Sequence, residues 1–311
     1  ISDEDVAYFA REDKLDIAID LTGHTNNSRH GIFAYRAAPL QISYLGYPGT
    51  TGSNFIDYLI ADTKLIPDDL KSYYIEKIIY LPNTYMATDN TRKFSNINIS
   101  RSAIGLPNDK FIFCCFNNNY KITPKEFNIW MSLLKKIDKS ILWLKKSNSI
   151  AENNLKKEAN KRNIDPSRLY FADIVSIEEH LSRHKLADLY LDTFSFNAHT
   201  SASEALWAGL PVVTKIGKSF SARVAGSLLN AIGLEELITE TAEEYEKVIY
   251  ELATNPKKLR HIREKLKNNR LSRPLFNSEL FVKHLENGFM QAYQNHIEGH
   301  KPKDLHVNNN L

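Results

Sequence analysis

Short apolar runs alternate with helix-like segments along most of the chain, and this alternation limits the fold more than any other feature. After residue 104, apolar runs such as 111–116, 140–144, 188–191 and 212–214 are separated by polar turns and segments with helical periodicity. Strands that alternate with helices form parallel sheets with right-handed crossovers. We therefore expect an α/β fold built on parallel sheets.

The length of 311 residues is enough for two domains. A polar stretch rich in Asn and Ser, residues 86–102, is the best candidate for a linker. We predict the C-terminal part of a first domain plus the linker over 1–103 and a second domain over 104–275. Residues 276–311 are expected to form a helix that packs back on the domains, followed by a loose tail. Because Ile1 lies in what resembles the end of a helix, we expect the first domain to be incomplete.

Charge and cysteine content narrow the class of protein. Lys and Arg total 40 against 37 for Asp and Glu, a balance that argues neither for nor against a nucleic-acid partner. Small basic clusters such as Lys145-Lys146 are more typical of solvated helix ends than of nucleic-acid patches, and we expect no nucleic-acid partner. The two cysteines, Cys114 and Cys115, are neighbours in a predicted strand and point to opposite faces, which excludes a disulfide framework. This usage suits a reducing compartment, and we expect a cytoplasmic protein. No apolar run approaches the roughly 20 residues of a membrane span.

Residues 191–213 carry the clearest functional signal. An apolar run ends in Asp192, a polar turn follows at 197–201, and a helix opens near residue 203. The first turn of a helix has free N–H groups and a partial positive charge, so this type of loop binds phosphates. An ordinary strand–turn–helix with a threonine N-cap would explain the same pattern. The candidate ligand-binding side chains here are His199, Thr200, Ser201 and Glu204.

Other polar loops follow predicted strands, where open parallel sheets bind their ligands. Lys121 precedes a helix start at Thr123 and is well placed for a phosphate, although a surface lysine is the alternative. His180 and Arg183 are three residues apart on one helix face, where they could bind a base or simply face solvent. The turn 46–50 contains two glycines, which permit close approach to a ligand or make a tight turn.

Several chemistries are excluded by motifs that the chain lacks. No GxGxxG follows a strand, which argues against a nicotinamide dehydrogenase, and no GxSxG elbow is present. His24 and His30 do not have a useful ligand spacing, and no Asp-x-Asp pair ends a strand. We therefore expect no catalytic metal and no cofactor.

The chain contains, in this order, the segments DLTGHT, RAAPLQISYLGYPGTTG, IDYLIAD, EKIIYLPNTY, FCCFNNNYKITP, ILWL, EEHLSRHKLADLYLDT, NAHTSASEALWAGLPVVT and SARVAGSLL. Taken together and in this order, they resemble the catalytic region of the O-linked GlcNAc transferase/SPINDLY family over about residues 15–290. The resemblance implies a GT-B architecture, with two Rossmann-like domains facing a cleft, and an inverting, metal-independent enzyme that uses nucleotide sugars. It also implies tetratricopeptide repeats upstream.

The resemblance also implies roles for particular residues. His180 and Arg183, with the backbone near Val175, match positions that hold uracil. Glu204 matches a carboxylate that bonds the ribose, and Ile177 replaces a family lysine near the nucleotide. The pyrophosphate side is implied to include His199, Thr200, Ser201, Asn118, Tyr120 and Lys121, and the sugar side Leu45, Gly46 and Pro48. The implied catalytic residues are Lys121, which stabilises the leaving diphosphate, His199, and Asp16, which stands where animal enzymes have a histidine near the acceptor.

The leading interpretation is a protein O-glycosyltransferase that transfers N-acetylglucosamine (GlcNAc) from UDP-GlcNAc to Ser or Thr of a protein acceptor. Transfer of fucose from GDP-fucose is the nearest alternative. A non-catalytic nucleotide-sugar-binding or scaffold domain, and a purely structural α/β module, are alternatives of other classes. Binding of UDP would separate the enzyme or binder from the structural module, and turnover would separate the enzyme from the binder.

Overall fold

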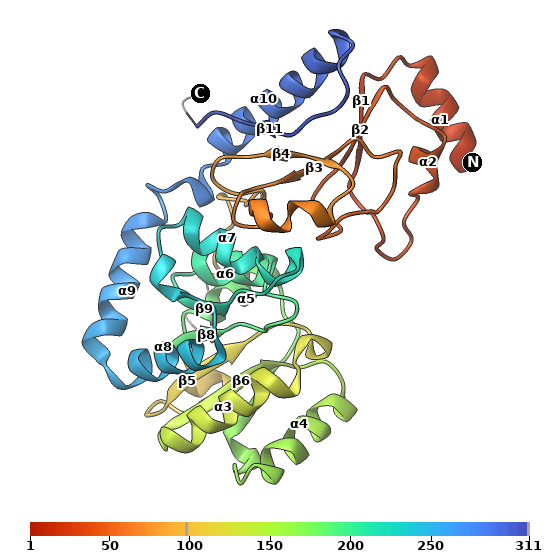
Figure 1. Ribbon diagram of the computed structural model, residues 1–311. Helices are drawn as coiled ribbons and strands as arrows, with labels where there is room; N and C mark the ends of the chain where they lie inside the picture. Colours follow the sequence, from red (N-terminus) through yellow and green to blue (C-terminus); the bar gives the residue numbers. More distant parts are fainter. Residues whose placement is uncertain (97–98, 310–311) are drawn as a thin grey trace. The chain divides into compact units, whose positions relative to one another are not determined.

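The computed structural model describes residues 1–96 and 99–309, and the chain divides into two compact units. The first unit contains residues 1–87 together with the segment that begins at Asn277, and the second contains residues 88–276 (Figure 1). The sequence-based boundary at residue 103 differs from this division, because the stretch that begins at Thr88 belongs to the second unit. Each unit is built on its own parallel sheet.

The first unit contains five short parallel strands and three α-helices among its described residues. Its elements are α1 (Asp3–Glu12), β1 (Ile17–Asp20), α2 (Gly31–Ala34), β2 (Leu40–Ser43), β3 (Tyr58–Ala61), β4 (Lys77–Tyr80), α10 (Ser278–Ile297) and β11 (Leu305–His306).

The strand order in this unit is β1-β2-β3-β4-β11, so the two ends of the chain contribute to one sheet. Leu305 pairs with Ile79, and His306 pairs with Tyr80. The prediction of a loose tail was wrong for this segment, because parallel pairing with β4 orders it. The helix α10 comes close to β4 at Gly288, where an added Cβ would lie 2.8 Å from the Ile79 side chain. The sequence gives no local signal for a strand of two residues.

The second unit contains six parallel strands and seven α-helices among its described residues. Its elements are β5 (Phe111–Cys115), α3 (Pro124–Lys136), β6 (Ser140–Lys145), α4 (Ser149–Lys161), β7 (Leu169–Ala172), α5 (Ile177–His184), β8 (Leu189–Leu191), α6 (Thr200–Trp207), β9 (Val212–Lys215), α7 (Val224–Ala231), β10 (Ile238–Thr239), α8 (Ala242–Thr254) and α9 (Pro256–Asn269).

The sheet of the second unit has the order β10-β9-β8-β5-β6-β7. From β5 the chain adds β6 and β7 on one side, and from β8 it adds β9 and β10 on the other side. The neighbours β5 and β8 therefore mark the point where the direction reverses. The helix α3 packs on β6, and α8 packs on β9 (Figure 1). Crevices at such a reversal, outside the carboxyl ends of the strands, are where doubly wound sheets bind ligands.

Local signals explain most of these helices. Thr123 and Ser176 cap α3 and α5 with reciprocal bonds to Glu126 and Glu179, and Pro124 occupies the first turn of α3. The sequence analysis missed α9, which is highly charged and buries only Leu259, Ile262 and Leu266. Its Asn255 cap and the Pro256 that follows were the available signal.

The stretch predicted as a linker is docked on the second unit over its described part. The side chains of Thr88 and Asn90 donate hydrogen bonds to the carbonyls of Leu275 and Phe276. The indole of Trp207 donates a 3.2 Å hydrogen bond to the carbonyl of Arg92. These contacts fix the backbone position of Arg92. Among the described helices, none is both long enough and apolar enough to cross a membrane.

Candidate functional site

The loops that follow β5 and β8 meet at the reversal point of the second sheet. Lys121 lies in a 3₁₀ turn directly after β5, and its Nζ donates a 3.2 Å hydrogen bond to the carbonyl of Asn197. The same Nζ lies 3.9 Å from the centroid of the Phe196 ring. The structure therefore brings Lys121 against the loop that precedes His199. Burial lowers the pKa of Lys121.

A buried carboxylate, Asp192, gives this loop its shape. Its Oδ1 accepts hydrogen bonds of 2.8 Å from the N–H of Thr193 and 2.6 Å from the N–H of Ala198. Its Oδ2 accepts a 2.7 Å bond from the hydroxyl of Thr214 on β9. Burial raises the pKa of Asp192 to about 7, although these donors and the charge of Lys121 oppose the rise. The sequence analysis used Asp192 only to mark the end of a strand.

The helix α6 presents an uncapped first turn. His199 occupies the N-cap position and makes no capping hydrogen bond with its side chain. The backbone N–H groups of Thr200 and Ser201 have no partner within the described part of the chain. The alternative of a threonine N-cap is therefore wrong, and two N–H donors and the helix dipole remain for a ligand.

His199 is a neutral hydrogen-bonding group in this environment. Its Nε2 lies 3.2 Å from the carbonyl of Ser221, and since a carbonyl only accepts, Nε2 carries the proton. The ring stacks on Phe196 with centroids 4.6 Å apart. Burial lowers the pKa of His199 to about 4. His199 can therefore orient a ligand and does not contribute a positive charge at neutral pH.

A cavity of about 360 Å³ extends from this helix start toward α5. Most of the second-unit residues that were predicted to bind the base, the ribose or the phosphates line this cavity. Its lining residues are Phe116, Lys145, Asp173, Ile174, Val175, Ile177, His180, Arg183, Thr200, Ser201 and Glu204.

His180 and Arg183 lie against Phe116 at the end of β5. The Arg183 guanidinium lies 4.9 Å from the Phe116 ring centroid, and the His180 ring lies 5.4 Å from it. Arg183 donates a 2.5 Å hydrogen bond to the carbonyl of Asp173. Buried Nε of Arg183 and Nδ1 of His180 have no partner among the described residues. Polar atoms left in this state are suited to a ligand with hydrogen-bonding edges.

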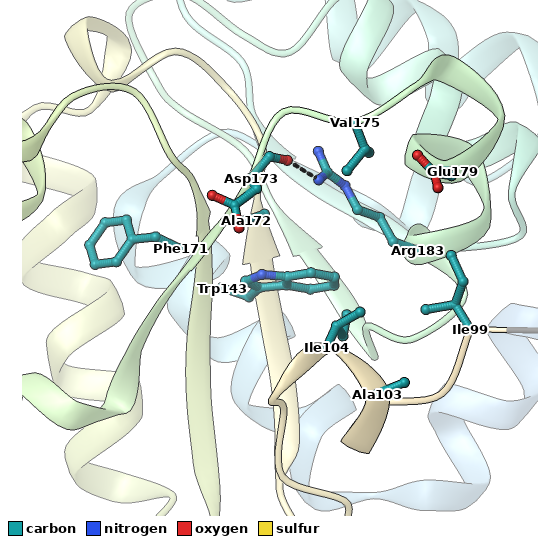
Figure 2. Close-up of a pocket in the computed structure, with 10 residues that line it drawn as sticks. All are labelled: Ile99, Ala103, Ile104, Trp143, Phe171, Ala172, Asp173, Val175, Glu179 and Arg183. Carbon is teal, nitrogen blue, oxygen red and sulfur yellow. Dashed lines mark hydrogen bonds between the residues drawn. The ribbon is translucent and has the colours of Figure 1, made fainter.

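Arg183 also borders a neighbouring hollow of about 340 Å³ with an apolar floor. In Figure 2 the guanidinium reaches toward Asp173, while the ring of Trp143 and the side chain of Ile104 lie beneath it. The predicted base-binding face thus has an apolar side and a polar edge.

Glu204 is held by two cationic or potentially cationic groups. Its Oε1 accepts a 3.0 Å hydrogen bond from Nη1 of Arg92, and its Oε2 lies 3.4 Å from Nε2 of His180. The Glu204 side chain is only 10% exposed, so these partners determine its orientation. The sequence analysis missed Arg92 because it lay in the stretch taken as a linker.

Asn118 and Tyr120, which were predicted to lie on the pyrophosphate side, have different surroundings in the structure. Asn118 accepts a 2.7 Å hydrogen bond from Nζ of Lys145. Tyr120 is 79% exposed, and its hydroxyl accepts a 3.3 Å bond from the Asn118 amide. Tyr120 does not line the cavity. Lys145 does line it, although the sequence analysis treated Lys145 with Lys146 as a solvated basic pair.

In the first unit, the predicted sugar-side turn follows β2. Leu45 has a positive φ of 68°, and Gly46 lies so close to β1 that an added Cβ would be 1.9 Å from the carbonyl of Leu21. Gly46 is therefore needed for close packing of two backbone segments, and a ligand is not required to explain it. Leu45, Gly46 and Pro48 lie at the carboxyl end of the sheet.

Asp16 lies at the opposite end of that sheet, just before β1. It is exposed and accepts a 3.1 Å hydrogen bond from the hydroxyl of Tyr293 on α10. Parallel sheets bind ligands at the carboxyl ends of their strands. The structure therefore places Asp16 apart from the loops at the carboxyl ends of the strands, and its catalytic role stays a prediction that the resemblance implies.

A chain of hydrogen bonds at the carboxyl end of β1 was also missed by the sequence analysis. His30 Nδ1 lies 2.7 Å from Oδ2 of the buried Asp20, and His30 Nε2 lies 2.9 Å from the hydroxyl of Ser53. His24 Nε2 lies 2.7 Å from the carbonyl of Thr51. These bonds tie the turn after β2 to the end of β1. Among residues 1–96 and 99–309, no group of three or more His, Cys, Asp or Glu is placed to hold a metal ion.

The second unit is thus a doubly wound α/β domain. The start of α6, Lys121 and the cavity lie at the reversal point of its sheet. The sequence model of glycosyl transferase family 41 matches residues 3–99 and 94–285, and the chain belongs to this family. The predicted resemblance is confirmed.

Relatives and a solved structure agree with this assignment. The probable UDP-N-acetylglucosamine–peptide N-acetylglucosaminyltransferase SEC of Arabidopsis thaliana is 38% identical over 99% of this chain. The corresponding SPINDLY protein of Petunia hybrida is 31% identical over 97% of it. The chain spans about a third of the length of these relatives, 32% in each case. A mutant of the Thermobaculum terrenum O-GlcNAc transferase superposes with a TM-score of 0.89 at 26% identity, over 96% of this chain and 57% of that one. The prediction of a GT-B type fold with two parallel-sheet α/β domains is confirmed.

Proposed function

We propose that this protein is an inverting, metal-independent O-glycosyltransferase that transfers GlcNAc from UDP-GlcNAc to Ser or Thr of a protein acceptor. The names of its relatives in Arabidopsis and Petunia describe this donor and a peptide acceptor. The observation that carries the proposal is the contact of Lys121 with the 193–199 loop, beside the free N–H groups of Thr200 and Ser201.

The chemistry requires stabilisation of a leaving diphosphate. The acceptor oxygen forms a bond to the anomeric carbon while the bond from that carbon to the diphosphate oxygen breaks, and the acceptor hydroxyl gives its proton to the surrounding water. Displacement from the opposite face inverts the anomeric configuration. Negative charge grows on the UDP oxygens as the bond breaks, and fixed donors aimed at that charge are usually the largest catalytic contribution. Lys121 and the first turn of α6 provide such donors in this chain, and His199 adds a neutral hydrogen-bonding group.

The residues that line the cavity on the side of α5 are suited to bind the nucleoside. Uracil fits against His180 and Arg183, with the backbone near Val175 offering amide groups to its edge. Glu204 would accept hydrogen bonds from the ribose hydroxyls. Its buried carboxylate is already oriented by its contacts with Arg92 and His180. Hydrogen bonds to a charged acceptor are stronger than those between neutral groups.

The test is binding and turnover with the full-length protein, for which the resemblance implies upstream tetratricopeptide repeats. Isothermal titration with UDP, UDP-GlcNAc, GDP and GDP-fucose should give tighter binding for the uridine compounds. Transfer of labelled GlcNAc to a Ser- and Thr-rich peptide should follow. Tighter binding of GDP-fucose would favour fucosyl transfer, and binding of UDP-GlcNAc without transfer to any protein would indicate a non-catalytic domain.

A further inference from the structure

Lys145 is the last residue of β6, and it lies at the cavity of about 360 Å³ described above. It lines this cavity together with Thr200 and Ser201, whose backbone N–H groups are free. Its Nζ donates a 2.7 Å hydrogen bond to Oδ1 of Asn118, which holds the ammonium in place at the end of the sheet. A lysine at this point is fixed by a neutral amide and keeps two further N–H donors.

Within the described part of the chain, Lys145 forms no ion pair with a carboxylate, so no described residue neutralises its charge in this way. Of the two carboxylates that border the cavity, Asp173 pairs with Lys146 at 2.6 Å, while Glu204 pairs with Arg92 and His180.

A second lysine lies nearby. Lys121 donates its hydrogen bond to a carbonyl. Burial lowers the pKa of Lys121, the charge of Lys145 adds to this lowering, and the charge of Asp192 opposes it. These two ammonium groups repel each other and lie beside free N–H donors. The site they form is therefore suited to bind an anion.

We propose that Lys145 binds the diphosphate of the nucleotide, with Asn118 as the residue that positions its ammonium. This inference rests on the proposed function, since it assigns a further ligand to the same donor site. Lys146, the next residue, provides a matched control, because its side chain is 50% exposed and paired with Asp173.

The experiment compares K145M and K146M in the full-length protein by isothermal titration with UDP and with uridine. Removing one charged hydrogen bond should weaken UDP binding by about 10- to 100-fold in K145M. Uridine lacks the diphosphate, so its affinity should stay unchanged, and K146M should bind both ligands as the unmodified protein does. K145R should recover part of the UDP affinity. Melting temperatures identify any variant that fails to fold, in which case the K145R and K146M titrations decide the question.

The inference is overturned if K145M binds UDP as tightly as K146M, or if it loses UDP and uridine affinity by the same factor. The second result would mean that Lys145 only supports the local structure. Failure of the unmodified protein to bind UDP would overturn the proposed function as well, and this differs from the first two results because it appears before any substitution is made.

Discussion

The carboxylate of Asp192 accepts a 2.6 Å hydrogen bond from the backbone N–H of Ala198, and this contact links a buried strand end to the start of α6. With the bonds from Thr193 and Thr214, it fixes the loop that carries His199. The candidate phosphate site therefore depends on a carboxylate that does not itself line the cavity.

Asp192→Asn should lower both stability and UDP affinity. The amide of Asn would turn an NH₂ group toward donors that now face carboxylate oxygens, and a buried donor without an acceptor costs about 1–3 kcal/mol. Calorimetric unfolding and UDP titration measure the two effects. Asp138→Asn, on the exposed surface, should change stability by less than about 0.5 kcal/mol. Equal effects of the two substitutions would show that the Asp192 bonds do not shape the loop.

Lys121→Ala should reduce turnover by about 10²–10³ while leaving the melting temperature nearly unchanged. Lys121 bonds only to a carbonyl and lies over an aromatic ring. Asp192, the buried carboxylate that its charge affects, keeps its hydrogen bonds from Thr193, Ala198 and Thr214 when Lys121 is removed. Lys121→Arg should recover little activity, because a planar guanidinium does not occupy the space of an ammonium. Steady-state kinetics and thermal unfolding provide the measurement. Near-normal turnover of Lys121→Ala would remove this residue from the mechanism.

Local patterns were enough to predict much of the fold and part of the site. Apolar runs marked the longer strands, and caps such as Thr123 marked helix starts, because both signals depend on residues close in sequence. Lys121 and Glu204 could be selected because they follow strand ends, and parallel sheets collect those ends on one edge.

What the sequence did not reveal depends on contacts between distant residues. The pairing of His306 with Tyr80 and of Arg92 with Glu204 leaves no periodic pattern. Asp16 was selected only through the family correspondence, and the structure places it at the amino end of β1, bonded to Tyr293. Lys145 was overlooked because two adjacent lysines give the same sequence pattern whether they lie at the end of a helix or at the end of a strand.

Turnover should survive EDTA. The charge on the leaving diphosphate is expected to be balanced by Lys121 and the first turn of α6, so no divalent ion is needed for this purpose. Activity is measured in full-length protein after dialysis against the chelator, with and without added Mn²⁺ or Mg²⁺. Activity that disappears with EDTA and returns with either metal would show that the metal-free mechanism is wrong.

His199 should remain neutral down to about pH 5. Burial lowers its folded-state pKa to about 4, below the unfolded value of 6.5. The unfolded chain therefore binds more protons between these values, so the contribution to stability is complete above about pH 6.5 and is lost as the pH falls toward 4. His199→Gln should flatten this part of the stability profile. NMR titration of the imidazole checks the pKa directly, and a midpoint near 6.5 would contradict the prediction.

Arg92 should determine how well the site distinguishes ribose from deoxyribose. Its guanidinium holds Glu204 at 3.0 Å, and the Trp207 indole anchors its backbone. If Glu204 receives the ribose hydroxyls, the unmodified protein should bind UDP about 10-fold more tightly than 2′-deoxy-UDP, the effect of one hydrogen bond to a charged group. In Arg92→Ala the carboxylate loses its fixed orientation, so this ratio should fall toward one, and Arg92→Lys should restore part of it. Asp89→Ala, which removes the more distant partner of Arg92 at 3.8 Å, should leave the ratio unchanged. If Arg92→Ala weakens UDP and 2′-deoxy-UDP by the same factor, Arg92 supports the fold of this segment and does not position Glu204 for the ribose.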